Sequence, residues 1–367
     1  MARRGWRVYQ LGLAAERESR VGRLNGVVLV RWREPRYRGG RLVRYLVAYA
    51  RFWWWAKWCL RRLRRRGGRA IDVVHVNNVP NFMIWAAASE RRRGAGLILD
   101  IHDPVPELFL SKFHDQRAAR VIAVLLKWEE RLASRAADLV LCVHEPHRAL
   151  TSGHGLDARK LRVVENLTDD RLFPVEPPRA PVPFVAYHGT VAARMGLDVL
   201  LEALSLLRRE GWPVRGAIWG DGDVVESLRR MRDTLGLGTD VEIPGQRFRL
   251  EQLLPRLREV GVGVIPLKRD RFTDIMLPTK LLEYVRLGIP VVATWTPTMA
   301  YYFPDDTVWF VRDPSPSGLA DALRDVLTAP EQARARAARA QGLAIARAWN
   351  DGEPDFVRIV EEVGACR

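Results

Sequence analysis

Residues 277–294 read LPTKLLEYVRLGIPVVAT, and this order of residue types predicts a helix that leads into a buried strand. A proline before the helix and a glycine after it bound an amphipathic helix over residues 280–287. The apolar run over residues 289–293 has the length and composition of a buried strand. The segment is therefore one helix-strand unit of an α/β chain.

Two charged residues in this helix point to a ligand. Lys280 lies in the first turn and Glu283 one turn later, so both flank the space above the helix N-terminus. A helix N-terminus attracts phosphate, lysine adds positive charge, and a carboxylate can accept hydrogen bonds from sugar hydroxyls. The segment thus suits a nucleotide sugar with its diphosphate and ribose. The alternative is a surface helix whose Lys280 and Glu283 are only solvated.

Five further segments place strand ends and loops in a recurrent order along the chain. They are LDIHDPVPELF (99–109), VVENLTDDRLFP (163–174), YHGTVAARMGLDVLLEAL (187–204), AIWGDGDVVESLRRM (217–231) and VEIPGQ (241–246). A lone glycine turn is weak evidence, but six segments in this order and spacing are a strong composite. The order resembles glycosyltransferase family 4, retaining enzymes of the GT-B fold, and the resemblance covers roughly residues 70 to 350.

The resemblance implies an α/β protein with two Rossmann-like domains that face each other across a cleft. We expect an acceptor-side and membrane-facing domain over residues 1–178 and a nucleotide-sugar domain over 179–346. Residues 347–367 are expected to form a C-terminal helix that packs back on the first domain. The five prolines within residues 174–183 favour a linker between the domains.

Length and composition agree with two globular domains. The chain has 367 residues, of which 48% are hydrophobic and 28% charged, as in an ordinary soluble protein. Cys59, Cys142 and Cys366 have neither disulfide nor metal spacing, and no signal peptide precedes them. We therefore expect a cytoplasmic location, no structural zinc and no cofactor.

Positive charge is concentrated near the N-terminus. Residues 1–70 hold 20 Arg and Lys against three Glu, a net charge of +17. Within them, residues 41–66 place one apolar stripe on a helix, formed by Leu42, Leu46, Tyr49, Trp53, Ala56, Leu60 and Leu63. Charged residues interrupt the apolar part of this helix, so we expect a helix that lies at the membrane interface and not one that crosses the membrane.

This basic helix predicts contact with an anionic membrane surface. Tryptophans prefer the headgroup level and arginines bind anionic lipid, which assigns a membrane role to Arg51, Trp53, Trp54, Trp55 and Trp58. One alternative is a helix of the domain whose stripe packs on the sheet while its arginines are solvated. Nucleic-acid binding also uses arginine with aromatic residues, but no recognised motif supports it, and we expect no nucleic-acid partner.

The rest of the first half alternates strands and helices in a doubly wound pattern. Strands are expected over residues 26–32, 72–76, 96–103, 137–143 and 161–167, and helices over 41–66, 82–93 and 118–136. The second half repeats the plan from Phe184, and a tail helix is expected over 351–364.

The opening strand and glycine-rich loop that the family resemblance implies have no convincing counterpart in residues 1–25. These residues are basic and polar, and 5–11 form at best a short strand. Either the missing strand and loop lie upstream of residue 1 in a longer form of the chain, which is the expectation we prefer, or the first domain is assembled differently.

The resemblance assigns donor binding position by position. The matching residues are Gly189, Thr190, Arg194, Gly220, Leu277, Thr279, Lys280 and Glu283. Thr190 stands where the family often has an arginine, so Arg194 and Lys280 are expected to supply the charge for the diphosphate. Glu283 matches the carboxylate expected at the ribose. Its usual partner falls at Ile275, and Asp274 beside it is the candidate substitute.

On the acceptor side, the resemblance implies that His102 and Asp103 face the transferred sugar. Both follow a predicted parallel strand, where ligands of such sheets gather. Glu107 and His144 are further acceptor-side candidates. A strand-end histidine alone is more often structural. The Asp-x-Asp of residues 221–223 is not expected to hold a metal.

These observations predict a retaining, metal-independent glycosyltransferase of the hexosyltransferase type. It would move a sugar from a nucleotide diphosphate to a lipid-linked or saccharide acceptor for polysaccharide synthesis, peripherally on the cytoplasmic face of the cell membrane. His102, Asp103 and Asp274 are the candidate catalytic residues. One alternative is a non-catalytic, membrane-associated protein of the same fold, which is favoured because residues 190 and 275 differ from those usual in the family. The other alternative is a nucleotide-sugar epimerase.

Overall fold

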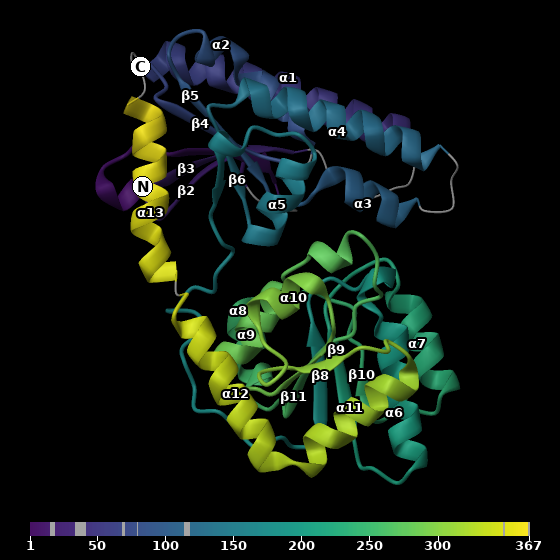
Figure 1. Ribbon diagram of the computed structural model, residues 1–367. Helices are drawn as coiled ribbons and strands as arrows, with labels where there is room; N and C mark the ends of the chain where they lie inside the picture. Colours follow the sequence, from purple (N-terminus) through teal and green to yellow (C-terminus); the bar gives the residue numbers. More distant parts are fainter. Residues whose placement is uncertain are drawn as a thin grey trace. The chain divides into compact units, whose positions relative to one another are not determined.

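A computed structural model of the chain describes residues 1–14, 19–33, 42–67, 70–78, 80–113, 118–347 and 349–365 (Figure 1). The chain forms two compact units. The first comprises residues 1–109, 116–164 and 354–367, and the second comprises residues 110–115 and 165–353. Cys366 and the three acidic residues of the basic N-terminal stretch lie outside the described residues.

The first unit is built on a four-stranded parallel sheet in the order β4-β5-β6-β7. Its strands are β4 (Val73–Asn77), β5 (Gly96–Ile101), β6 (Leu139–Cys142) and β7 (Leu161–Val163). Its helices are η1 (Ala2–Arg4), α1 (Leu42–Gly67), η2 (Asn81–Ala87), α2 (Ala88–Arg91), α4 (Ala119–Ala136), α5 (Glu145–Gly153) and η3 (Ala158–Lys160). Two more helices, α3 (Val105–Lys112) and α13 (Trp349–Ala365), have residues in both units. The expected helix over 82–93 is a 3₁₀ turn followed by one α-helical turn.

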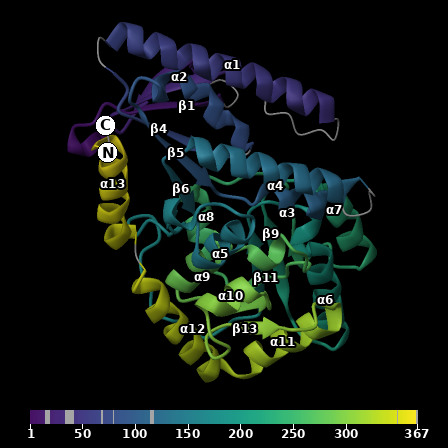
Figure 2. The ribbon, with the colours of Figure 1, turned by 45° about the horizontal axis from the view of Figure 1, so that its top comes forward.

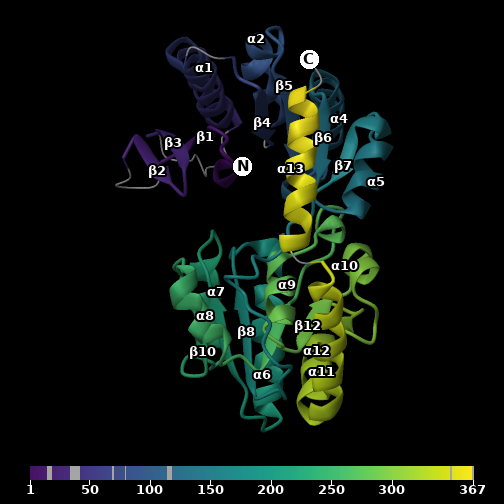
Figure 3. The same ribbon diagram turned by 90° about the vertical axis from the view of Figure 1, so that its left-hand side faces the viewer.

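Both faces of this sheet are covered, which explains the continuous apolar run of its central strand. On one face, Leu97 and Leu99 pack with residues of α1, η2 and α4. On the other face, Ile98 packs with Val360 and Val363 of α13. The expected return of the C-terminal helix to the first unit is therefore present, and Figure 3 shows α13 beside β5 and β6.

A separate three-stranded sheet near the N-terminus has the order β1-β3-β2. Its strands are β1 (Tyr9–Leu13), β2 (Val21–Leu24) and β3 (Val27–Trp32), with β1 parallel and β2 antiparallel to β3. Asn25 and Gly26 both have positive φ, as a two-residue hairpin turn requires. The strand expected over 26–32 is present, but it does not join the four-stranded sheet. The short strand expected over 5–11 lies at 9–13.

The second unit holds a six-stranded parallel sheet in the order β10-β9-β8-β11-β12-β13. Its strands are β8 (Phe184–His188), β9 (Arg215–Trp219), β10 (Val241–Glu242), β11 (Val262–Ile265), β12 (Val291–Thr294) and β13 (Trp309–Val311). Its helical elements are η4 (Ala193–Met195), α6 (Leu197–Arg209), α7 (Val225–Thr234), α8 (Leu250–Leu257), η5 (Thr273–Ile275), α9 (Thr279–Arg286), α10 (Pro297–Tyr302), α11 (Pro316–Thr328) and α12 (Pro330–Ile345). The helix and strand expected within 277–294 are α9 and β12.

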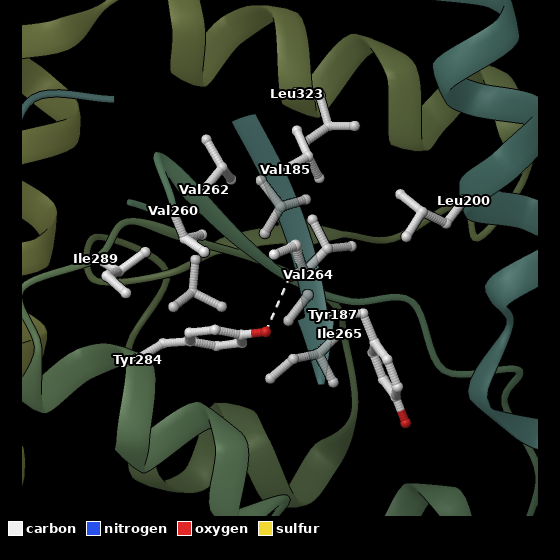
Figure 4. Packing of buried hydrophobic residues seen from close by; sticks show 14 of the residues in the cluster. Val185, Tyr187, Leu200, Val260, Val262, Val264, Ile265, Tyr284, Ile289 and Leu323 are labelled. Carbon is white, nitrogen blue, oxygen red and sulfur yellow. Dashed lines mark hydrogen bonds between the residues drawn. The ribbon is translucent and has the colours of Figure 1, made fainter. Parts of the chain in front are cut away.

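A close contact fixes α9 against this sheet. The hydroxyl of Tyr284 donates to the backbone oxygen of Ala186 in β8 at 2.9 Å, the dashed line of Figure 4. A Cβ at Gly263 of β11 would lie 2.6 Å from the Tyr284 ring. Glycine at that position therefore lets the ring lie flat on the strand.

The chain divides at residue 165, and not at 178/179 as expected, because the proline-rich segment packs on the second unit. Phe173 is part of that unit's core. Its backbone oxygen accepts from Nε of the buried Arg286 at 2.8 Å, and Asp170 pairs with the same guanidinium at 2.8 Å. Gln341 donates to the backbone oxygens of Glu176 and Arg286 at 2.7 and 2.9 Å. The second division likewise lies at 353/354, and not at 346/347, because α13 joins the first unit's core.

We expect Arg286→Met to destabilise the second unit, because it leaves Asp170 and the Phe173 oxygen without their buried partner. A one-sided loss of a buried ion pair costs about 3–5 kcal/mol. Urea titration should show the second unit unfolding at a clearly lower midpoint. Arg324→Met is the matched control, since Arg324 forms ion pairs with Glu210 and Asp321 at the surface and should leave the midpoint unchanged. Equal midpoints for both variants would refute the role of Arg286.

Candidate donor and acceptor sites

Two turns meet at the carboxyl edge of the second unit's sheet, where β8 and β9 end. A Cβ at Gly220 would lie 1.8 Å from the backbone oxygen of Gly189, and one at Gly222 would lie 1.7 Å from that of Val191. Gly189 itself has φ of +118°. The two turns can therefore approach each other this closely only because residues 220 and 222 are glycines.

Lys280 lies directly beneath the Gly189 turn. A Cβ at Gly189 would be 3.2 Å from Cε and 3.4 Å from Nζ of Lys280. The ammonium lies 4.6 Å from the ring centroid of Tyr187 and donates to its hydroxyl at 3.3 Å, and that hydroxyl donates to the Thr190 oxygen at 2.6 Å. Burial lowers the pKa of Lys280 to about 8, with Glu283 opposing the shift and Arg194 adding to it. The lysine is therefore held in one place with little hydration.

Glu283 lies one turn further along α9. Burial raises the pKa of its carboxyl to about 7, against the charge of Lys280. Nε2 of His188, the last residue of β8, lies 3.2 Å from Oε2 of Glu283. Burial and the Lys280 charge lower the pKa of His188 to about 3, so its imidazole is neutral at physiological pH. A carboxylate in this setting suits hydroxyl donors such as those of a ribose.

Arg194 adds a second cation near this edge. It lies in η4, which is followed by Gly196 with φ of +64°. Its guanidinium lies 5.7 Å from the ring centroid of Phe272. The Arg194 charge contributes to the lowered pKa of Lys280.

The remaining donor candidates lie at the start of α9 and before it. Thr279 is exposed as the first residue of the helix, and Leu277 is half-buried. Asp274 lies in η5, and both of its carboxylate oxygens accept from Arg269, at 2.9 and 3.0 Å. Asp274 is thus already paired, and any sugar hydroxyl would have to share it with Arg269.

In the first unit, His102 lies just past the end of β5 and belongs to a cluster of polar side chains. Its Nε2 lies 3.3 Å from Oδ2 of Asp100 and 3.1 Å from Oδ1 of Asn77. Nε2 of His75, on β4, lies 2.9 Å from the same Asp100 oxygen. Asn78 binds the adjoining loop, because its amide donates to the Asp103 oxygen at 2.7 Å. The His102 side chain is 42% exposed, so it remains open to a ligand.

Interactions within this cluster favour the protonated, positively charged form of His102. Burial alone would raise the pKa of Asp100, but hydrogen bonds with His102 and His75 outweigh it and lower that pKa to about 2. The hydrogen bond with Asp100 raises the pKa of His102, against the effect of burial. Asp100 therefore both orients the His102 ring and stabilises its imidazolium form.

The structure corrects the two acceptor-side candidates. Glu107 is 5% exposed, and Oε1 lies 3.1 Å from Nε2 of the buried His154, whose Nδ1 lies 2.7 Å from Glu130. His144 is 3% exposed, and its Nδ1 accepts from the His147 N–H at 3.1 Å as the cap of α5. Both side chains are internal contacts of the first unit and not surfaces for an acceptor.

The apolar stripe expected to face a membrane packs inside the first unit. Ala56 and Leu60 of α1 are buried. Trp53 and Trp55 are half-buried, and the Trp55 ring lies 5.5 Å from that of Trp32. This placement matches the alternative in which the stripe belongs to the domain core. Side chains of Leu42 and Leu46 lie outside the described residues. Arg51, Trp54 and Trp58 are exposed on the other side of the helix.

Two absences among the described residues bear on the site. No group of three or more His, Cys, Asp or Glu in the described ranges is arranged to hold a metal ion. No helix within those ranges has the length and apolarity needed to span a bilayer.

Sequence reasoning missed three residues of these sites. His188 and Tyr187 directly precede Gly189, and Asp100 lies two positions before His102 on the same face of β5. The period of two along a strand was the available signal for Asp100. No sequence signal places His188 beside Glu283, because that pairing depends on how α9 packs on β8.

Known proteins agree with this geometry. Residues 1–172 match a family described as Glycosyltransferase Family 4, and residues 182–329 match one described as Glycosyl transferases group 1. Alpha-D-kanosaminyltransferase of Streptomyces kanamyceticus is 27% identical over 298 residues, which are 76% of this chain and 74% of that protein.

Solved structures share the fold. Sucrose-phosphate synthase of Thermosynechococcus elongatus superposes with a TM-score of 0.75 at 17% identity, covering 100% of this chain and 91% of the other. Anabaena Alr3699/HepE in complex with UDP and glucose gives a TM-score of 0.61 at 17% identity, covering 79% and 78%. Fold and site thus define a GT-B glycosyltransferase, a hexosyltransferase that uses a nucleotide-sugar donor. The match to glycosyltransferase family 4 over residues 1–172 agrees with the resemblance in the sequence pattern.

We expect Asp100→Asn to lower the pKa of His102, because the negative charge that raises it is lost and only a neutral amide oxygen is left to accept the hydrogen bond. Histidine-selective NMR titration of the full chain measures this pKa directly. Asp157→Asn is the control, since Asp157 pairs with Arg159 at the surface of the same unit and should leave His102 unchanged. An unaltered His102 titration in Asp100→Asn would show that Asp100 does not set its charge.

Proposed function

We propose that this enzyme is a retaining, metal-independent glycosyltransferase that moves a hexose from a nucleoside diphosphate to a saccharide or lipid-linked acceptor. The observation that carries the proposal is the half-buried Lys280 beneath the Gly189 turn, with its ammonium against the Tyr187 ring. Positive charge held in place at low hydration stabilises a departing diphosphate. The likeness to Alr3699/HepE, whose structure holds UDP and glucose, supports a nucleoside diphosphate as the group bound here.

In this proposal, Glu283 accepts hydrogen bonds from the ribose, beside the neutral imidazole of His188. Lys280, Arg194 and the N-terminus of α9 supply the charge that opposes the diphosphate, so no metal ion is needed for that role. His102, held by Asp100, donates a hydrogen bond to the transferred sugar or the acceptor. Asp103 follows His102 in the same loop and takes a positioning role.

We place the acceptor at the cytoplasmic face of the cell membrane, in a pathway of polysaccharide synthesis. The support is the net charge of +17 in residues 1–70 and the exposed side of α1, where Arg51 lies with Trp54 and Trp58. Arginine with tryptophan suits anionic headgroups. A soluble saccharide is the competing acceptor class.

The reaction class can be tested with a panel of nucleotide sugars and saccharide acceptors in excess EDTA. We expect transfer with the anomeric configuration of the donor kept, measured by NMR coupling constants of the product. Lys280→Met should reduce turnover by about 10²-fold or more, the usual loss when one anion-stabilising donor is removed. Inversion at the anomeric carbon, or complete loss of activity in EDTA, would overturn the proposal.

The charge of Lys280 can be tested through pH. Because its pKa in the free protein is lowered to about 8, the ammonium is mostly present at pH 7.5 and mostly lost at pH 9.5. The nucleoside diphosphate that binds best in a panel should therefore bind about tenfold more weakly at pH 9.5, by calorimetry.

Two variants separate Lys280 from general effects of pH. Lys280→Met should bind weakly at pH 7.5 and show little further loss at pH 9.5. Lys268→Met should behave like the unaltered protein, because Lys268 is half-exposed and paired with Asp198. The same pH dependence in Lys280→Met as in the unaltered protein would rule Lys280 out as the titrating group.

A further inference from the structure

A second exposed helix carries apolar residues that the first unit leaves uncovered. In α4, Val121, Val124, Leu125 and Trp128 are 64, 65, 60 and 59% exposed. Their spacing of i, i+3, i+4 and i+7 places them on one side of the helix. The opposite side is buried through Ala123, Ala133 and other residues. An amphipathic helix normally turns such a stripe inward, so this one points to a partner.

The exposed side of α1 has the same character. Val47, Trp54 and Trp58 are 52, 63 and 54% exposed, and they share one helix side with Arg51 and Arg62. The guanidinium of Arg62 lies 5.1 Å from the Trp58 ring, so the charge is held against an apolar surface.

Both helices cover the same face of the four-stranded sheet. Leu60 of α1, Ile84 of η2 and Ala133 of α4 join one core cluster with Leu97 and Leu99 of β5, opposite the face that α13 covers. Figure 2 shows α1 and α4 on the outside of this unit. The 3₁₀ helix η2 contacts both of them and exposes 42% of Trp85. The outward sides of all three elements therefore point away from the same sheet face.

Charge on these outward sides is of one sign in the described residues. Helix α1 contains no Asp or Glu at all. The acidic residues of α2 and α4 turn inward: Glu90 and Glu130 are 1% and 0% exposed, and Glu129 accepts from the amide of Asn81 at 3.0 Å. Exposed cations remain along α4 as Arg120, Arg131 and Arg135. This pattern is complementary to an anionic surface.

We propose that α1, η2 and α4 together form one docking surface for an anionic lipid membrane, with the apolar stripe of α4 inserting between headgroups. The tryptophan surface, as we call it, consists of Val47, Trp54, Trp58, Trp85, Val121, Val124, Leu125 and Trp128 with the arginines beside them. Tryptophan and arginine at the rim with small aliphatic residues between them suit the interface of a bilayer. The inference rests on the proposed membrane location and extends it from one helix to three elements.

The test is flotation of the full chain with vesicles of phosphatidylcholine alone or mixed with phosphatidylglycerol. The unaltered protein should bind the mixed vesicles, more weakly as salt rises, and bind phosphatidylcholine poorly. Val124→Glu with Leu125→Glu should lower the partition coefficient at least tenfold, because two inserting side chains are lost. Both residues are exposed, so the fold should persist, and circular dichroism checks this.

The matched control is Val21→Glu with Leu24→Glu on β2. These residues are each 61% exposed, lie in the separate N-terminal sheet, and change the net charge by the same amount. The control should bind within twofold of the unaltered protein. If both variants lose vesicle binding equally, the effect is due to net charge alone. If the α4 variant loses no vesicle binding, α4 is not part of the docking surface.

Two further readouts distinguish a membrane-docking surface from a dimer interface and from a lipid-independent enzyme. Sedimentation without lipid tests whether the α4 stripe joins two copies of the chain, and a dimer that the α4 variant dissociates would overturn the membrane proposal. If the unaltered protein does not bind anionic vesicles, both the proposed membrane location and this inference are wrong. Transfer to a soluble saccharide acceptor should persist in the α4 variant, so the proposed sugar-transfer reaction is judged independently.

Discussion

The donor side of this enzyme depends on one desolvated ammonium. The half-buried Lys280 has Glu283 one turn along the same helix, which favours its charged form, and the Tyr187 ring and hydroxyl face its head group. The same arrangement holds the glycine turn above it, since the Tyr187 hydroxyl also binds the Thr190 oxygen. A strand end, a turn and a helix are thereby tied together at the point where a diphosphate would bind.

Two histidines of the first unit, of which only His102 is a candidate site residue, show how similar chemistry serves different ends. His102 and His154 each interact with carboxylates, and in each the pKa is raised. His154 lies between Glu107 and Glu130 with 3% of its surface exposed, so its charge holds three helices together. His102 keeps an open side because Asp100 and Asn77 reach it from within the strands. Exposure, and not protonation, separates the reactive candidate from the structural one.

Much of this arrangement could be predicted from the sequence because it depends on local order. The helix over 279–286, the strand after it, and the glycines at 189 and 220 follow from spacing and turn chemistry. Whether the apolar stripe of α1 faces the domain core or lipid could not be predicted, because the sequence pattern of such a stripe is the same in both cases. The prolines of 174–183 suggested a free linker, whereas contacts with Arg286 and Gln341, far along the chain, hold the segment in place.

The covering of the four-stranded sheet by α13 has a consequence for synthesis on the ribosome. Val360 and Val363 complete the core around Ile98, yet the whole second unit separates them from that strand in the chain. Domains made first usually fold first, as soon as they emerge. Here the second unit can finish folding while the first still exposes one sheet face to chaperones. The first unit, although it is translated first, thus completes its core only after the last helix has been made.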